Sequence, residues 1–207
     1  MGLQSKMFAV MYDRMIAGTE KAGMRANRES LLAGARGDVV EIGGGTGANL
    51  PFFGADVTSV KITEPEALMA KRLEKKLADH GGAPVEVVLA PAEQLPFENE
   101  SFDTAVSTLV LCAVGDQQRA LSEIHRVLKP GGRLLFAEHV RSDDAGMARW
   151  QDRLNGLNKM MVGCNCNRST LDTIAQAGFT VSDVTHGELP KAPPFVRPFI
   201  MGSAVAG

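Results

Sequence analysis

Residues 38–49 read DVVEIGGGTGAN, and the other motifs of the chain are arranged around this stretch. Apolar residues lead into Glu41 and Ile42, and glycine then occupies four of the five positions from 43 to 47. The pattern predicts a buried strand that ends in a tight turn, where a ligand can approach the backbone closely. The spacing G-x-G-x-G lacks the last glycine of the dinucleotide fingerprint G-x-G-x-x-G. An acidic side chain before the turn disfavours a pyrophosphate and favours a ligand with a positively charged amino group.

Length and charge limit the classes of protein to which the chain can belong. The 207 residues suit one domain, residues 1–207, with its own hydrophobic core. The formal net charge is −2, and basic residues such as Arg14, Arg25 and Arg28 are scattered as on helix faces in water. We therefore expect no nucleic-acid partner.

The cysteines indicate a reduced protein. There are three, Cys112, Cys164 and Cys166, and this odd, sparse set does not form a disulfide framework. We expect a cytoplasmic protein without an integral membrane segment, because no window approaches the ~18 apolar residues of a membrane span. Cys164-Asn165-Cys166 has no second cysteine pair and no nearby histidine in sequence, so we expect no metal site.

Predicted strands and helices alternate along the chain. Strands are expected at 38–42, 57–63, 85–89, 102–111, 133–137 and 179–184, and a final apolar segment at 199–206. Helices are expected at 3–35, 67–78, 116–128, 142–163 and 170–177, with a short one after Gly47 that Pro51 ends. This order predicts an α/β fold with a doubly wound, mostly parallel sheet and helices on both faces. Ligands of such sheets bind at the carboxyl ends of the strands.

An acidic residue at the end of the second predicted strand strengthens the case for a nucleoside. Glu64 lies 21 positions after Gly43, the offset at which an acid accepts hydrogen bonds from ribose hydroxyls. A glutamate after a strand is usually solvated surface, but the glycine turn favours the ligand role. Three further pairs also follow strands: Ala92-Glu93, Thr108-Leu109 and Glu138-His139.

Three motifs in the right order resemble those of one family. They are VVEIGGGTG at 39–47, AEQLPF at 92–97 with SFD at 101–103, and EIHRVLKPGG at 123–132. The chain thus resembles the class I S-adenosylmethionine-dependent methyltransferases of type 11. The resemblance implies a Rossmann-like sheet of seven strands with the last antiparallel, and S-adenosylmethionine as cofactor with S-adenosylhomocysteine as product.

Further segments are similar to one small branch of that family, the branch that contains the alkyl-thiol methyltransferases. They are TGAN at 46–49, TLVLCAV at 108–114, EHV at 138–140 and GCN at 163–165 with Arg168, followed by VRP at 196–198 and GSAV at 202–205. This closer resemblance implies a thiol acceptor.

The family resemblance also implies a set of cofactor-binding residues: Glu41, Gly43, Gly45, Gly47, Glu64, Ala92, Glu93, Thr108 and Leu109. The glycines would approach the methionine portion, with Glu41 near its amino group and Glu64 on the ribose. The pair at 92–93 would contact adenine, and the pair at 108–109 the carboxyl and sulfonium end. Pro91 stands where many relatives have aspartate, so adenine binding is expected to rest on the Ala92 amide and on Leu95 packing.

Candidates for the acceptor side come from both ends of the chain. Methyl transfer to a thiol needs mainly alignment, because a pKa near 8.5 leaves some thiolate at neutral pH. A hydroxyl acceptor needs a base, and His139 is the best-placed catalytic candidate; a histidine satisfied at a strand end is the other interpretation. The resemblance divides the chain into N-terminal lid helices at 1–36, a cofactor-binding core at 37–140, and an acceptor and hairpin region at 141–207. The acceptor pocket would be lined by Tyr12 of the lid and by Trp150 and Cys164 of the last region.

The predicted function is methyl transfer from S-adenosylmethionine to a small, largely apolar acceptor, a thiol on the closer resemblance. The alternative acceptors are a quinone, phenol, lipid head group or natural product, methylated on oxygen or nitrogen. Two other classes stay open. One is a protein that binds S-adenosylmethionine or S-adenosylhomocysteine without catalysis, and the other is a nicotinamide-dependent oxidoreductase, against which the G-x-G-x-G spacing and Glu41 speak.

Overall fold

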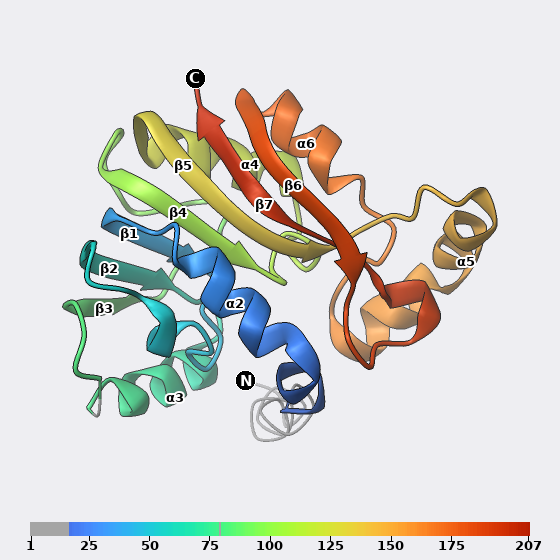
Figure 1. The fold of residues 1–207 in the computed structure, drawn as a ribbon, viewed down its shortest axis with the longest axis horizontal. Coiled ribbons are helices and arrows are strands. Elements are labelled where there is room, and N and C mark those ends of the chain that lie inside the picture. The colour runs from blue at the N-terminus through green and yellow to red at the C-terminus, as the bar shows by residue number, and fades with distance from the viewer. Residues whose placement is uncertain (1–16, 79) are drawn as a thin grey trace.

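The computed structural model describes residues 17–78 and 80–207, which form a seven-stranded sheet flanked by helices (Figure 1). The strand order is β3-β2-β1-β4-β5-β7-β6. The strands β1 to β5 pair in parallel, and β7 lies antiparallel between β5 and β6. The predicted fold, a Rossmann-like sheet with an antiparallel last strand, is confirmed.

The bounds of the elements follow the predicted alternation closely. The strands are β1 (Gly37–Ile42), β2 (Val57–Thr63), β3 (Val85–Val88), β4 (Phe102–Thr108), β5 (Leu128–His139), β6 (Phe179–Glu188) and β7 (Pro198–Ala206). The helices are α2 (Arg25–Leu32), α3 (Ala67–Leu77), α4 (Gln117–Val127), α5 (Ala145–Val162) and α6 (Thr170–Gln176). Short turns of other helix types are η1 (Glu20–Met24), η2 (Leu50–Phe52) and η3 (Pro194–Val196).

Two hydrophobic cores, one on each face, hold the sheet between its helices. Successive residues of β1 show the division, because Val39 belongs to the core with Leu32 of α2, and Val40 to the core with Leu121 of α4. All four side chains are fully buried. Alternate residues of a strand point to opposite faces, so a strand covered on both sides reads as a continuous apolar run.

Two predicted elements are shorter than expected. The helix expected after Gly47 is only the single turn η2, with Pro51 inside it. The strand expected at 102–111 ends at Thr108, because Leu109 adopts a left-handed conformation with φ of 59° and turns the chain away from the sheet.

The parallel register brings the functional ends of the strands to one edge. Ile42 at the end of β1 pairs with Thr63 of β2 on one side and Ser107 of β4 on the other. Thr108 in turn pairs with Ala137 of β5. Residues that follow these strands therefore meet at the same edge. In the described part of the chain, none of the helices combines the length and the apolar character that a bilayer crossing requires.

The hairpin β6–β7 depends on a glycine where three strands are packed tightly. A β-carbon on Gly202 would lie 1.9 Å from the carbonyl oxygen of Asp183, beside the register shift between Val181 and Asp183. Gly187, in β6, has space for a β-carbon, with no atom of the described residues within 4 Å.

We predict that Gly202→Ala lowers the free energy of unfolding by about 1–3 kcal/mol, because the added methyl group forces β6 and β7 apart. Gly187→Ala is the matched control and should change it by no more than about 0.5 kcal/mol. Urea denaturation of both variants measures the difference. Equal midpoints for the two variants would contradict the packing argument.

Candidate active site

The glycine turn after β1 is held between β2 and the loop that follows β4. Gly43, Gly45 and Gly47 all have positive φ angles, of 62°, 57° and 82°. A β-carbon on Gly43 would lie 2.8 Å from the methyl groups of Val110, and one on Gly44 would lie 2.1 Å from Cγ2 of Ile62. Larger residues are therefore excluded at these two positions, because neighbouring side chains fill the space that a β-carbon would need.

Glu64 connects this turn to the end of β2. Its Oε2 accepts a hydrogen bond from the Gly45 N–H at 2.8 Å, and its Oε1 accepts one from the Glu66 N–H at 2.9 Å. Burial raises the pKa of the Glu64 carboxyl, and the two backbone donors partly offset this effect. Each oxygen still has a free lone pair, so the carboxylate can accept further hydrogen bonds from a ligand.

A cleft of about 320 Å³ lies at this edge of the sheet. It brings together five of the residues predicted to bind the cofactor: Gly43, Glu64, Ala92, Glu93 and Leu109. The rest of its wall includes Pro91 and three residues of the loop after β4, namely Val110, Ala113 and Val114. The cleft is therefore lined by residues that follow β1, β2, β3 and β4.

Glu93 also fixes the start of α4. Its Oε1 accepts hydrogen bonds from the N–H groups of Gly115 at 2.7 Å and Asp116 at 3.2 Å. The guanidinium of Arg119 donates to the Glu93 carbonyl oxygen at 3.0 Å. The side chain of Glu93 is thus anchored across the cleft wall.

A buried polar network lies beside the glycine turn, at the ends of β1 and β4. The Asn49 amide donates to Oε1 of Glu41 at 2.9 Å and to the Thr108 hydroxyl at 3.0 Å. The Arg28 guanidinium donates to the Asn49 carbonyl and to the Thr108 hydroxyl, both at 2.8 Å, and pairs with Glu20 at 3.1 Å. Helix α2 is thereby connected to both strands.

One oxygen of Glu41 is left without a partner in this network. Glu41 is only 2% exposed, and no group among residues 17–78 and 80–207 donates to its Oε2. Burial raises the pKa of the Glu41 carboxyl to about 7, although the Arg28 charge and the Asn49 hydrogen bond act in the opposite direction. A buried acceptor without a donor is costly, so the position is suited to a ligand that brings a cation or an N–H group.

Sequence reasoning missed Arg28 and Asn49. Arg28 was expected among solvated basic residues, and this expectation is wrong, because the residue is only 4% exposed. It lies four positions after Met24 and three before Leu31, both buried, and so on the inner face of the helix. This spacing from apolar residues was the signal in the sequence that Arg28 is buried.

Glu138 at the end of β5 organises the loop after β4. Its Oε1 accepts hydrogen bonds from the Ser107 hydroxyl at 2.8 Å and from the N–H groups of Val110 and Leu111 at 3.0 and 3.1 Å. Its Oε2 accepts a long one from the Cys112 N–H at 3.4 Å. The side chain is fully buried, and burial raises its pKa while these donors lower it.

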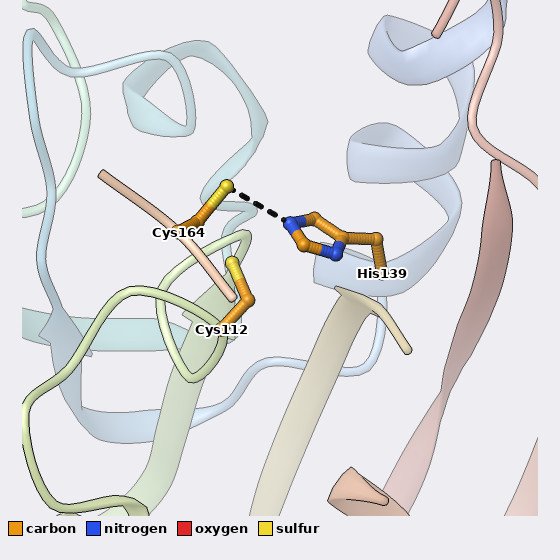
Figure 2. Close-up of side chains that lie close together, drawn as sticks. All are labelled: Cys112, His139 and Cys164. Atoms are coloured by element: carbon orange, nitrogen blue, oxygen red, sulfur yellow. Dashed lines mark hydrogen bonds between the residues drawn. The ribbon is translucent and has the colours of Figure 1, made fainter. Parts of the chain in front are cut away.

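His139, the next residue, points toward two cysteines (Figure 2). Its Nε2 lies 3.2 Å from Sγ of Cys164, and Sγ of Cys112 completes a group whose three atoms all lie within 4.8 Å of one another. Cys112 and His139 are buried, whereas Cys164 is partly exposed. A hydrogen bond with Cys112, followed by one with His139, holds the pKa of the Cys164 thiol well below its usual range, and the pKa of Cys112 is correspondingly raised.

The other cysteine of the Cys164-Asn165-Cys166 motif takes no part in this group. Sγ of Cys166 lies 3.8 Å from the Gln151 carbonyl and 3.7 Å from Oδ1 of Asn155, in a buried position beneath α5. The expectation that Cys164 lacks a nearby histidine holds along the sequence but is wrong in space.

The remaining acceptor candidates do not gather at the cleft. Trp150 lies on α5 with 61% of its surface exposed, and the same helix carries other exposed apolar residues such as Met160 and Met161. Tyr12 lies outside the described residues. Cys164 is therefore the acceptor candidate that the structure places next to His139.

Comparisons with known proteins agree with this geometry. Residues 40–136 match the family model described as a methyltransferase domain. The chain is 34% identical over 206 residues to the human thiol S-methyltransferase TMT1A, covering 96% of this chain and 82% of that protein. It is 36% identical over 135 residues to the ubiquinone/menaquinone biosynthesis C-methyltransferase UbiE of Hahella chejuensis, covering 63% and 54%.

Among solved structures, a SAM-dependent methyltransferase from Thermotoga maritima, described as a possible histamine N-methyltransferase, shares the fold. The TM-score is 0.70, with 24% identity and 97% of each chain covered. The glycine turn, the acids at the strand ends and the match along nearly the whole chain lead to one conclusion. The chain belongs to the class I S-adenosylmethionine-dependent methyltransferases, in the branch that includes the thiol S-methyltransferases.

Proposed function

We propose that the chain transfers the methyl group of S-adenosylmethionine to the sulfur of a small, largely apolar thiol. The observation that carries this proposal is the similarity to the human thiol S-methyltransferase, which extends over 96% of the chain. The group formed by Cys112, His139 and Cys164 supplies candidate residues for the acceptor side. The acceptor is the proposed element, since methyl transfer itself follows from the family.

The described residues fit S-adenosylmethionine, which supplies an electrophilic methyl group on a sulfonium. The free Oε2 of Glu41 is suited to the ammonium group of the methionine portion, and the positive φ angles of Gly43, Gly45 and Gly47 shape the turn that we propose follows this portion. Glu64 would accept hydrogen bonds from the ribose hydroxyls. The remaining predicted contacts are Ala92 and Glu93 with the adenine, and Thr108 and Leu109 with the carboxyl and sulfonium end.

The chain contributes mainly alignment and exclusion of water. Glu138 fixes the loop at 109–112, and this loop has the cofactor cleft on one side. Cys112 belongs to the same loop, and together with His139 and Cys164 it forms the group that we propose meets the acceptor. His139 is predicted as a base for the acceptor; its Nε2 lies 3.2 Å from Sγ of Cys164, and its Nδ1 has no hydrogen-bond partner among the described residues.

We also propose the division into lid helices at 1–36, a cofactor core at 37–140, and an acceptor and hairpin region at 141–207. Tyr12 and Trp150 stay predicted members of the acceptor pocket. A reducing, cytoplasmic setting is supported by the three free thiols of Cys112, Cys164 and Cys166. The main alternative is methylation of a quinone or phenol, which the similarity to UbiE favours.

Incubation with methyl-labelled S-adenosylmethionine and a panel of hydrophobic thiols, quinols, phenols and amines tests the proposal. We expect label in the thioether products of the thiols. Label only in quinol or phenol products would favour the alternative acceptor. Tight S-adenosylhomocysteine binding with no product from any acceptor would indicate a binding protein.

For Glu64→Ala we predict weaker S-adenosylhomocysteine binding by about 1–3 kcal/mol, because charge-assisted hydrogen bonds to the ribose are lost. The matched control is Glu86→Ala, which removes an exposed carboxylate that pairs with Lys61 on the surface of β3. Isothermal titration calorimetry measures both. The ribose assignment fails if the two variants bind equally well.

Cofactor binding should release protons through Glu41. A carboxyl with a pKa of about 7 is half protonated at pH 7, and an ammonium group beside it favours the ionised form. Binding of S-adenosylhomocysteine at pH 7 should therefore release roughly half a proton. Affinity should fall as the pH drops below 7, because the carboxyl must then lose its proton first.

Calorimetry in buffers with different ionisation enthalpies measures this release. Glu41→Gln should bind more weakly and should lose the proton release. If the variant releases as many protons as the unchanged protein, then the protons come from another group.

A further inference from the structure

Cys112, His139 and Cys164 come from three segments that are distant in sequence. Cys112 lies in the loop after β4, His139 ends β5, and Cys164 follows α5. Figure 2 shows both sulfur atoms on the side of the imidazole that carries Nε2. The three potential ligand atoms lie within 4.8 Å of one another, and Nε2 of His139 lies 3.2 Å from Sγ of Cys164.

The spacing of these atoms suits a tetrahedral ion. Zinc binds thiolate sulfur at about 2.3 Å and imidazole nitrogen at about 2.0–2.1 Å, so ligands of one tetrahedral ion lie roughly 3.5–3.8 Å apart. The 3.2 Å between Nε2 and Sγ of Cys164 and the upper limit of 4.8 Å for the whole group are compatible with this spacing after small side-chain rotations. Two sulfurs and one nitrogen are also the donor types that zinc prefers over oxygen ligands.

The backbone holds the two cysteine loops against each other. The Asn165 backbone N–H donates to the Cys112 carbonyl oxygen at 2.8 Å, and the Asn165 side-chain amide donates to the same oxygen at 3.2 Å. The Asn158 side chain donates to the Cys164 carbonyl at 2.7 Å and approaches its Sγ at 3.6 Å. Such surrounding contacts fix ligand positions before an ion binds.

Glu138 lies next to these ligands without competing for the ion. Its oxygens are occupied by the Ser107 hydroxyl and by backbone donors of the loop at 110–112. Its position beside His139 adds an acidic group close to where a cation would sit. This arrangement lowers the electrostatic cost of placing a divalent cation in a buried position.

We propose that Cys112, His139 and Cys164 bind a zinc(II) ion and leave its fourth position for the acceptor thiol. Three protein ligands with one open position are typical of catalytic zinc sites. The partly exposed Cys164 marks the open side, since the other two ligands are buried. The binding of an acceptor thiol at the fourth position of the ion rests on the proposed function as a thiol methyltransferase.

The chemistry balances without an oxidant or reductant. The acceptor thiol binds the ion as a thiolate, and its proton passes to solvent. A sulfur lone pair then forms the new S–CH₃ bond while the bond from the methyl group to the sulfonium breaks, and that electron pair stays on the leaving sulfur. The uncharged thioether is a weaker ligand and dissociates. In this arrangement His139 acts as a ligand, and the ion replaces a base.

Cobalt(II) substitution tests the site independently of catalysis. The purified protein should bind one equivalent of cobalt with the intense visible bands of tetrahedral coordination and with sulfur-to-cobalt charge-transfer absorption. Cys112→Ser, Cys164→Ser and His139→Asn should each lose this spectrum. Cys166→Ser is the matched control, because it removes a buried thiol two residues away that faces Gln151 and Asn155. Retained S-adenosylhomocysteine binding verifies that each variant is folded.

Addition of an alkanethiol to the cobalt protein should shift the visible bands. The metal site is overturned if the protein does not bind cobalt or zinc stoichiometrically, or if Cys166→Ser loses the cobalt spectrum as fully as the ligand variants do. If an alkanethiol leaves the visible bands unchanged, the acceptor thiol does not occupy the fourth coordination position. If the metal-free protein methylates thiols at an undiminished rate, the catalytic role of the ion is refuted while the proposed function stands. If the protein binds the ion but methylates no thiol, the metal site stands and the proposed function fails.

Discussion

The buried carboxylate of Glu138 fixes the loop on which both halves of the site depend. It accepts hydrogen bonds from the end of β4 and from three successive N–H groups at 110–112. Loss of the carboxylate would leave those donors buried and unsatisfied, which is more costly than the gain from each bond. The left-handed turn at Leu109, the wall of the cofactor cleft and the position of Cys112 therefore all depend on one residue of β5.

The three acids at this edge are compensated to different degrees. Glu138 has four donors, and Glu64 has two backbone N–H groups. Glu41 has one amide donor and the indirect charge of Arg28, and it keeps an oxygen without a partner among the described residues. The acid with the least compensation is the one whose pKa rises to about 7. An unsatisfied group of this kind can contribute to ligand binding more than one already neutralised by the fold.

The sequence predicted the sheet and the glycine turn because each depends on a short, local pattern, and the ribose-binding role of Glu64 stays a prediction. It could not predict contacts between distant segments. Arg28 and Thr108 are 80 positions apart, and only the packing of α2 on the sheet brings them together. The apolar residues 109–111 were predicted as strand because periodicity does not reveal that Glu138 accepts the hydrogen bonds of the Val110 and Leu111 N–H groups. The thiol–imidazole group was missed for the same reason, since its members lie on three elements.

The loop at 109–114 has a consequence for how the two ligands influence each other. Val110 and Ala113 face the cofactor cleft, while Cys112 between them faces His139 and Cys164. If the cofactor orders this loop when it binds, the acceptor proposed to bind beside Cys112 binds with a changed free energy, and thermodynamic linkage makes that coupling equal in both directions. These six residues would then couple the affinity for the cofactor to the affinity for the acceptor.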